Sequence, residues 1–530
     1  MKCTSRCENT FREVMPVRED TLERLLFSAN AWKLSSTRVH RNVTIRRRPT
    51  MPDTTAARRC FARRFPACYD ASLRRFTRYF LNVTGGSQAL NTYMTDHIQS
   101  TKLPNGLTIL TEYMPGLRSV TLGIWVRRGS RHETTMQNGI CHFIEHAVFK
   151  GTERRTALDI AIESDRLGGH LDAYTTHETT GFAIKVVDTA FAQAFDLLAD
   201  MLACPRFDSE DLAREQRVII EEMKMVEDTP DEYLGELFNA AYFPNHPLGR
   251  PIEGTAETVS SFNRDRTVDY HKREYAPHNL VIAAAGNIDH AHLVKLAARI
   301  FSEKSLDDQA GKASHNQSDD AASQSHNTTP PAHAAPILIE RKKELEQAHL
   351  IIAAPWPSAR SDERYAASLL ASIIGGGTSS RLWQSVREER GLAYSVGAGS
   401  SGFSDTGVFT IYAGTSPDKL DEVIDLSLHE MRRATRESVS DEELQLVKDQ
   451  SVSSILLGLE SSSARAGSLA QQEIIHGRRI SPDEVIARIQ AVMPEDLQRI
   501  AQANFKSDAL ALGVLGDLNG FKADRARLEI

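Results

Sequence analysis

Two histidines and a glutamate at helical spacing are the residues of this chain with the clearest chemical potential. His142, Glu145 and His146 stand in the run Gly-Ile-Cys-His-Phe-Ile-Glu-His-Ala, which begins at Gly139. Residues at i and i+4 lie one above the other on a helix, and i+3 shares their face. Two imidazoles one turn apart can bind one Zn²⁺, with a carboxylate beside the metal to handle protons. The same residue types also occur on solvated helix faces, so the motif needs support from the rest of the chain.

A third ligand is expected on another element, because a hydrolytic zinc site uses three protein ligands and keeps one position for water. Glu222 follows His146 by 76 residues, in a stretch that reads as an amphipathic helix after an N-cap signal at Asp208. Glu215 and Glu222 are two helical turns apart, so both can face the metal helix, whereas Glu221 is rotated by about 100° from Glu222. Periodicity alone does not choose the ligand among these glutamates.

Further motifs follow in a fixed order along the chain. They are Leu103-Pro-Asn-Gly-Leu107, Gly168-Gly-His-Leu-Asp-Ala-Tyr-Thr-Thr-His-Glu-Thr179, Pro247-Leu-Gly-Arg-Pro251, Tyr275-Ala-Pro-His-Asn-Leu280 and Arg387-Glu-Glu-Arg-Gly-Leu-Ala-Tyr-Ser-Val396. With the His-x-x-Glu-His run, they resemble the pitrilysin-type (inverzincin) zinc metallopeptidases. The resemblance is strongest to the subgroup that contains the mitochondrial processing peptidase beta subunit and its bacterial relatives. It extends from about Leu103 to Leu518.

The resemblance implies one Zn²⁺ per chain, with His142, His146 and Glu222 as its ligands. Glu145 matches the general base of the family, which takes the proton of the attacking water and delivers it to the leaving amine. Glu215 matches an acidic neighbour of the metal site, which orients a ligand or balances charge.

The resemblance also assigns substrate contacts. Tyr394 is expected to stabilise the carbonyl or oxyanion and Arg387 to hold the substrate backbone. Asp172 and Ala173 match an edge strand whose backbone pairs with an extended substrate. Family members commonly carry Asn where this chain has Asp172, and the change removes amide donors and adds a charge.

Composition places most of the chain among globular proteins. It has 530 residues, of which 41% are hydrophobic and 25% charged, which leaves room for more than one core. No apolar run reaches the roughly 18 residues of a membrane helix, so we expect no membrane span. Residues 1–93 differ, since they hold 18 Lys+Arg against 7 Asp+Glu although the whole chain has a net charge of −7.

We interpret residues 1–93 as a basic N-terminal extension that is disordered or foreign to the native protein. Glu8, Glu13 and Glu19 argue against a mitochondrial transit peptide, which is poor in acidic residues. A nucleic-acid-binding arm would carry aromatic stacking motifs, which are not evident here, so we expect no nucleic-acid partner.

The body is expected to be α+β, with two homologous domains that each have a mainly antiparallel sheet covered by helices. We place a zinc-binding domain at 94–303, a polar linker at 304–336 and a domain without metal at 337–530. The strand ending at Gly286 has a counterpart ending at Gly516, which supports an internal duplication. The resemblance implies that the two domains face each other as half of a clam shell.

These features predict a zinc-dependent metalloendopeptidase that cuts unfolded or short peptides, including presequence-like ones. The alternative is a non-catalytic scaffold or substrate-holding subunit of a processing-peptidase-like complex. Pairing into a homodimer, or into a heterodimer with a related subunit, is implied by the resemblance. Cys141 and Cys204, the two cysteines of the body, suit a reducing compartment. We therefore expect the bacterial cytoplasm, with the mitochondrial matrix as the alternative.

Overall fold

The computed structural model of the chain describes residues 97–311, 330–518 and 520–530. The basic extension 1–93 and most of the expected linker lie outside the described residues. Helix α10 (His290–Gly311) continues past residue 303, so its last turns occupy the first part of the predicted linker. The other domain boundaries remain predictions.

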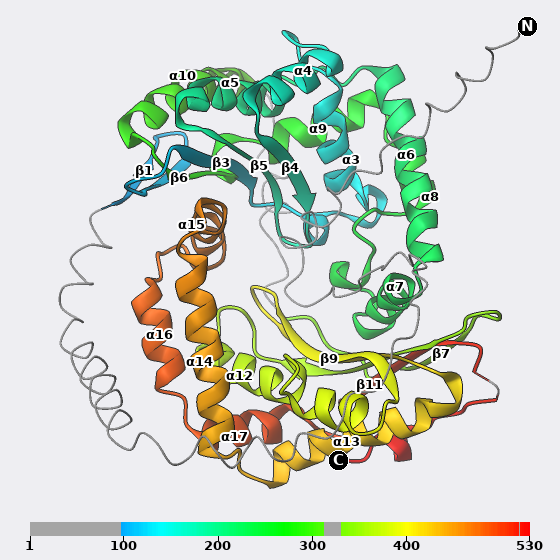
Figure 1. Cartoon of the computed structure of the whole chain (residues 1–530). Helices are drawn as coiled ribbons and strands as arrows, with labels where there is room; N and C mark the ends of the chain where they lie inside the picture. The colour runs from blue at the N-terminus through cyan, green and yellow to red at the C-terminus, as the bar shows by residue number, and fades with distance from the viewer. Residues whose placement is uncertain (1–96, 312–329, 519) are drawn as a thin grey trace, which may run out of the picture.

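The first domain contains a six-stranded sheet in the order β1-β2-β6-β3-β5-β4 (Figure 1). Only β2 and β6 pair in parallel, and the other neighbours are antiparallel. The strands are β1 (Ile98–Lys102), β2 (Thr108–Tyr113), β3 (Ser119–Val126), β4 (His170–Thr175), β5 (Thr180–Val187) and β6 (Leu280–Gly286). β6 is buried along its whole length, as its central place in the sheet requires. β4 is an edge strand, as the resemblance implied.

Helices cover one face of this sheet and enclose the core of the first domain. They are α3 (Ile140–Ala147), α4 (Ala157–Leu167), α5 (Phe191–Ala203), α6 (Ser209–Asp228), α8 (Ala256–Ser260), α9 (Arg264–Glu274) and α10. The remaining helix of this part of the chain, α7 (Pro230–Tyr242), packs on the sheet of the second domain instead. α5 packs directly on β3 and β5. Its residues Phe195, Leu198 and Leu202 are almost fully buried, at the spacing of one helical stripe.

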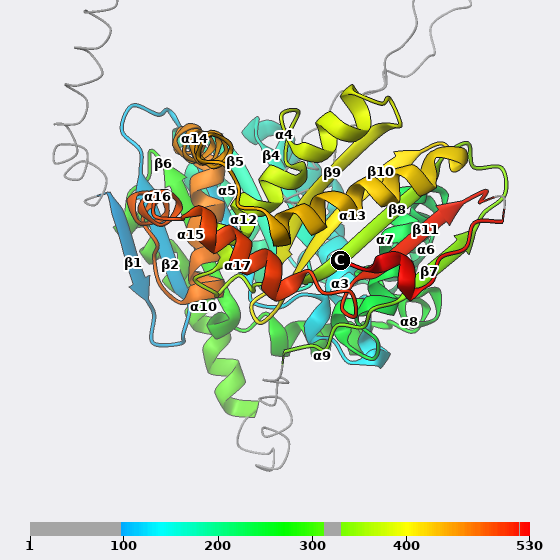
Figure 2. The same cartoon turned by 90° about the horizontal axis from the view of Figure 1, so that it is seen from below.

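The second domain repeats this plan. Its sheet has the order β7-β11-β8-β10-β9, which matches β2-β6-β3-β5-β4 strand for strand and again contains one parallel pair. The strands are β7 (Ile337–Arg341), β8 (Ala348–Trp356), β9 (Ala393–Gly402), β10 (Gly407–Thr415) and β11 (Ala511–Gly516). The helices are α12 (Arg364–Gly375), α13 (Leu420–Arg436), α14 (Asp441–Gly458), α15 (Ser462–His476), α16 (Pro482–Gln490) and α17 (Pro494–Asn504). Figure 2 shows α13 and α17 side by side across the outer side of this sheet. The predicted duplication and α+β class are confirmed.

Each domain provides a helix that covers the free face of the other domain's sheet. α7 of the first domain packs on β8 and β11, where Leu234 and Phe238 join a core with Ile351. α15 of the second domain packs on β2, β3 and β6, where Ala466 joins a core with Trp125. Figure 1 shows α15 below the first sheet and α7 above the second. α7 and α15 occupy equivalent places in the two copies, so the exchange is reciprocal.

A buried ion pair adds to the contact made by α15. Arg465 donates from Nε to Glu112 of β2 at 2.6 Å, and the two residues are 8% and 7% exposed.

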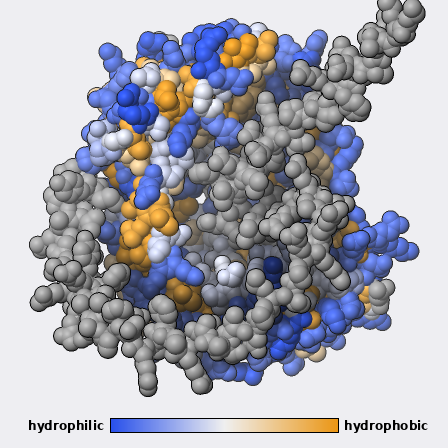
Figure 3. All heavy atoms as spheres, in the orientation of Figure 1, coloured by the Kyte–Doolittle hydropathy of each residue, from blue (hydrophilic) through white to orange (hydrophobic). Residues whose placement is uncertain are grey.

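Hydrophobic residues gather in Figure 3 on the side where α14 and α15 lie, and Leu457 of α14 is 68% exposed. Among the helices of the described ranges, none has the length and apolar character needed to cross a membrane.

Candidate metal centre

Helix α3 presents the His-x-x-Glu-His motif because its other face is apolar. Ile140, Phe143, Ile144 and Ala147 are buried in the first core. The helix begins after Gly139, whose φ of 94° lies in the left-handed region. A Cβ at this position would lie 2.3 Å from the Glu253 carbonyl oxygen, so only glycine fits there.

His142, His146 and Glu222 meet at one point. One ligand atom from each residue can be chosen so that all lie within 4.8 Å of one another, and the two imidazole centroids are 4.6 Å apart. His146 Nε2 lies 3.5 Å from the Glu222 carboxylate. Glu221 instead pairs with Lys224 and is 69% exposed on its side chain. The geometry therefore favours Glu222 over Glu221, which the helical period alone could not do.

Glu215 contacts His146 on the side of the ring opposite Glu222. Its carboxylate lies 3.3 Å from Nδ1 of His146 and 2.8 Å from the Lys150 ammonium. With Nδ1 held in this way, the opposite nitrogen Nε2 faces Glu222. A carboxylate on the far side of a ligating imidazole orients the ring and raises its basicity.

The donor set fits zinc. Two imidazoles and one carboxylate are a common protein ligand set for a catalytic Zn²⁺ and leave a fourth position for water. Nδ1 of His142 is buried and has no hydrogen-bond partner among the described residues. An imidazole nitrogen left without a partner is costly in an apolar setting, and a bound metal ion or its water would offset that cost.

Burial and local charge shift the pKa values of His142, Glu145 and His146 in different ways. Burial, with His146 nearby, lowers the pKa of His142 to about 3, so this ring is in the neutral form that binds metal. Burial opposes protonation of His146, but Glu215, Glu222 and Glu145 outweigh it and raise its pKa. Burial raises the pKa of Glu145 to about 7, against the opposing effects of Thr175 and His146. A carboxyl group that titrates near neutrality can both accept and return a proton.

Asp172 and Ala173 lie on the edge strand β4, which pairs only with β5 among the described strands. The Asp172 side chain is 45% exposed and lies 2.8 Å from His170. Ala173 packs against the first core. The outer backbone edge of β4 is thus available beside the metal helix, which β4 contacts.

Arg387 and Tyr394 form a pair in the second domain. The Arg387 guanidinium lies 4.9 Å from the centroid of the Tyr394 ring and donates to the Tyr394 carbonyl at 2.5 Å. Tyr394 is 60% exposed. Within the described parts of the chain, no hydrogen bond, ion pair or ring contact joins either residue to the metal cluster. The structure brings the two residues to each other but not to the candidate zinc ligands.

Three residues near the site were missed by the sequence reasoning. Thr175 donates to the Glu145 carboxylate at 2.6 Å. Lys150, one turn after His146 on the same face, pairs with Glu215, and its helical spacing was a usable signal. Glu133 is 3% exposed and accepts from the backbone N–H groups of Gly139 and Cys141, each at 2.8 Å. Glu133 precedes the helix by a loop, so no periodicity could indicate it.

The duplicated sheet-and-helix architecture and the His-x-x-Glu-His helix with its distant glutamate together define a class of two-domain zinc-motif proteins. The sequence matches the family models described as “Insulinase (Peptidase family M16)” over residues 108–256 and “Peptidase M16 inactive domain” over residues 261–451. It is 38% identical over 428 residues to an “Uncharacterized zinc protease” of Streptomyces coelicolor, covering 81% of this chain and 91% of the relative. A Bacillus subtilis protein of the same description is 37% identical, with coverage of 77% and 96%.

The chain belongs to peptidase family M16, the pitrilysin-type family expected from its motifs. Solved structures agree on the fold. A protease from Helicobacter pylori superposes with a TM-score of 0.69 at 20% identity, over 79% of this chain and 99% of the other. A chain of Complex III2 from Candida albicans gives a TM-score of 0.67 at 21% identity, over 82% and 100%.

Proposed function

We propose that the protein is a zinc-dependent metalloendopeptidase that hydrolyses peptide bonds in unfolded or short peptides, presequence-like segments included. The observation that carries the proposal is the position of Glu145. Its buried carboxyl group lies on the same helix face as both histidine ligands, and burial raises its pKa to about 7. Relatives that carry the description zinc protease support the same reading.

The residues of this chain have separate tasks in the proposed reaction. His142, His146 and Glu222 would hold one Zn²⁺ per chain, which when bound lowers the pKa of water and polarises the scissile carbonyl. Glu145 accepts the proton of the attacking water and returns it to the leaving amine nitrogen. Thr175 fixes one carboxylate oxygen of Glu145 at 2.6 Å, so the other oxygen is free to take the proton.

The edge strand β4 is the proposed docking element for the peptide. A substrate in extended form would add to the sheet beside β4, with Asp172 and Ala173 in contact with it. Main-chain pairing requires an unfolded segment and reads little sequence, which supports the substrate class. Arg387 and Tyr394 keep their proposed roles in holding substrate and stabilising the oxyanion. The two residues do not contact the ligand cluster within this chain. In the proposed homodimer or heterodimer, these roles at one metal centre would therefore have to be filled by residues of the other subunit.

The test is Glu145→Gln, measured for zinc content and for cleavage of an unstructured peptide. We expect zinc at one per chain in both proteins and a loss of turnover of about 10²-fold or more, since the base is removed and the ligands are kept. Glu222→Ala should lose zinc, and Glu221→Ala, on the same helix, is the matched control that should keep it. Undiminished turnover in Glu145→Gln would refute the proposal.

The alternative is a non-catalytic scaffold or substrate-holding subunit. A family model described as an inactive domain matches residues 261–451, and this second copy has the apolar α12 in place of a metal helix. The complete ligand cluster in the first copy favours the enzyme. If this protein binds zinc but cleaves no peptide, either alone or in a reconstituted homodimer or heterodimer, the scaffold function is favoured. The bacterial relatives support the bacterial cytoplasm as the proposed location.

A further inference from the structure

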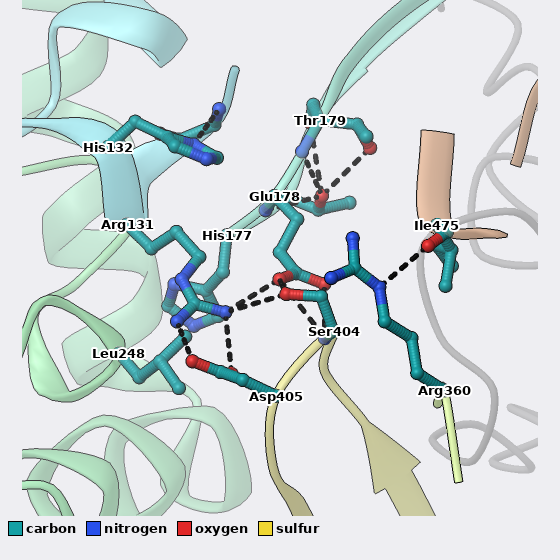
Figure 4. A network of polar contacts seen from close by, with 12 residues as sticks. Arg131, His132, His177, Glu178, Thr179, Leu248, Arg360, Ser404, Asp405 and Ile475 are labelled. Carbon is teal, nitrogen blue, oxygen red and sulfur yellow. Dashed lines mark hydrogen bonds and ion pairs between the residues drawn. The ribbon is translucent and has the colours of Figure 1, made fainter. Parts of the chain in front are cut away.

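A polar network joins the two domains close to the candidate metal centre. We name it the domain latch, and it consists of Arg131 and Glu178 from the first domain and Ser404 and Asp405 from the second. Arg131 donates to Asp405 at 2.7 and 3.0 Å and to Glu178 at 2.6 Å. Ser404 donates its backbone N–H to Glu178 at 3.0 Å and its hydroxyl at 2.6 Å. Figure 4 shows Ser404 and Asp405 at the tip of the β9–β10 hairpin, next to Arg131 and Glu178.

The side chains of the latch are partly buried, so water screens their charge–charge interactions less than at the surface. The side chains of Arg131, Glu178 and Asp405 are 11%, 18% and 23% exposed. Charge-assisted hydrogen bonds in such surroundings are shorter and stronger than those between neutral groups. A bidentate contact from a guanidinium to a carboxylate also fixes the relative orientation of the two groups.

One route from the latch leads to Glu145. Glu178 lies in the turn that joins β4 to β5, and β4 ends at Thr175, which donates to the Glu145 carboxylate at 2.6 Å. The loop before Arg131 holds the same turn from the other side, because the N–H groups of Ser130 and Arg131 donate to the carbonyls of residues 176 and 177 at 3.1 and 2.9 Å. The position of Thr175 therefore depends on the β4–β5 turn, which Ser404 of the second domain contacts through Glu178.

A second route leads to the metal helix. Arg131 stands two residues before Glu133, whose carboxylate accepts N–H groups from Gly139 and Cys141 at the start of α3. His142 is the next residue. A displacement of Arg131 would thus be passed to the helix that carries both histidines and the proposed base.

Contacts other than the latch also join the two domains. α7 buries Leu234 and Phe238 on the second sheet, and α15 buries Ala466 and Ala470 on the first. These apolar contacts, with the buried Arg465–Glu112 pair, stabilise domain association independently of the latch. The polar contacts at the β9–β10 tip are then available for another task.

We propose that Arg131, Glu178, Ser404 and Asp405 are positioning residues, through which the second domain sets the place of Thr175, Glu145 and the start of helix α3. The tip of the β9–β10 hairpin is the contact point. The kinetic part of this inference rests on the proposed function. The structural part concerns only the order of the site in the folded chain.

The experiment compares Asp405→Asn with Glu473→Gln in the full chain. Asp405 and Glu473 are each 23% exposed, and each pairs with an arginine of the first domain. Glu473 lies on α15 and pairs with Arg127, which directly follows β3. Among the described residues, no hydrogen bond or ion pair joins Glu473 to the latch. Both changes remove one charge from the domain interface and keep the shape of the side chain. Ser404→Ala is a second and milder change within the latch.

The first readout is amide hydrogen exchange of the metal-free protein. We expect Asp405→Asn to speed exchange of the 139–146 and 175–179 segments by about tenfold, as loss of a charge-assisted contact permits. Ser404→Ala should act in the same direction on 175–179. Glu473→Gln should leave both segments unchanged. Unaltered exchange in Asp405→Asn, or equal acceleration in Glu473→Gln, would overturn the inference.

The second readout is peptide cleavage by the zinc-loaded protein. Misplacement of the base should lower kcat by about tenfold in Asp405→Asn and leave KM nearly unchanged. An effect on KM alone would contradict a positioning role. The two proposals fail separately, because Glu145→Gln tests the reaction while the exchange experiment tests the latch without any metal or substrate.

Discussion

The two histidines of the metal motif have the same residue type and opposite environments. Burial and the nearby His146 lower the pKa of His142 and keep its ring neutral, whereas His146 is held between Glu215 and Glu222. The sequence predicted both as ligands, because i and i+4 positions share a helix face whatever surrounds them. It could not predict the difference, since Glu215 and Glu222 reach His146 only after α6 has packed on α3.

A second titrating pair lies near the site. Burial raises the pKa of Glu236 to about 7, and the neighbouring Glu253 adds to the rise. Burial also raises the pKa of Glu253, with a contribution from Glu222. Folding therefore favours the protonated form of Glu236. Its contribution to stability is complete below about pH 4.5 and is lost as the pH rises through about 7.

Glu236→Gln should remove this dependence, because Gln is neutral at every pH. We expect the variant to be more stable than the native chain at pH 8, with the difference vanishing at pH 5. Urea denaturation at the two pH values measures it. Glu346→Gln makes the same change of charge at an exposed loop position and should give no such pH-dependent difference. A constant offset for Glu236→Gln would contradict the assignment.

Helix α3 shows how one element depends on residues outside itself. With only eight residues, it is too short to be stable alone in water. Its start is fixed by Gly139 in the left-handed region and by the Glu133 carboxylate, which accepts from two of its first N–H groups. Contacts with residues outside the helix thus provide stability that the eight residues of α3 cannot provide alone.

Two glycine substitutions should shift stability in opposite directions. Gly139→Ala places a methyl group 2.3 Å from a carbonyl oxygen at a φ of 94°, and we expect a loss of roughly 2 kcal/mol or more. Gly235→Ala lies inside α7 with nothing within 4 Å of the added methyl group, and we expect a gain of up to about 1 kcal/mol. Chemical denaturation of both variants checks the two signs. Equal effects would mean that backbone conformation does not govern either position.

The secondary structure was accessible from sequence where a repeat supported it. The strands that end at Gly286 and Gly516 lie where the internal repeat predicted them. Helix α10 extends to Gly311, past the predicted linker start at residue 304, because the charged tail of α10 reads equally well as helix or loop. The faces covered by α7 and α15 were not predictable, since amphipathic periodicity shows which side of a helix is buried but not which sheet buries it.

At the scale of the molecule, each sheet needs a helix from the other domain. Separate production of residues 94–311 or 330–530 should therefore give a protein that aggregates, because the sheet face under α15 or α7 is exposed. Co-expression of the two fragments should give a 1:1 complex, measured by size-exclusion chromatography with light scattering. Fragments that stay monomeric and folded when alone would show that the exchanged helices are dispensable.

The reciprocal placement of α7 and α15 also bears on the ancestry of the chain. The two helices are equivalent members of the repeat, and each lies on the sheet of the other copy. A single-copy ancestor with this sequence pattern would have had an uncovered sheet and a helix without a partner. Two such copies related by a twofold axis satisfy both needs at once. The present chain has the arrangement that fusion of two such helix-exchanged copies would give, and among the described residues the candidate metal cluster lies in the first copy.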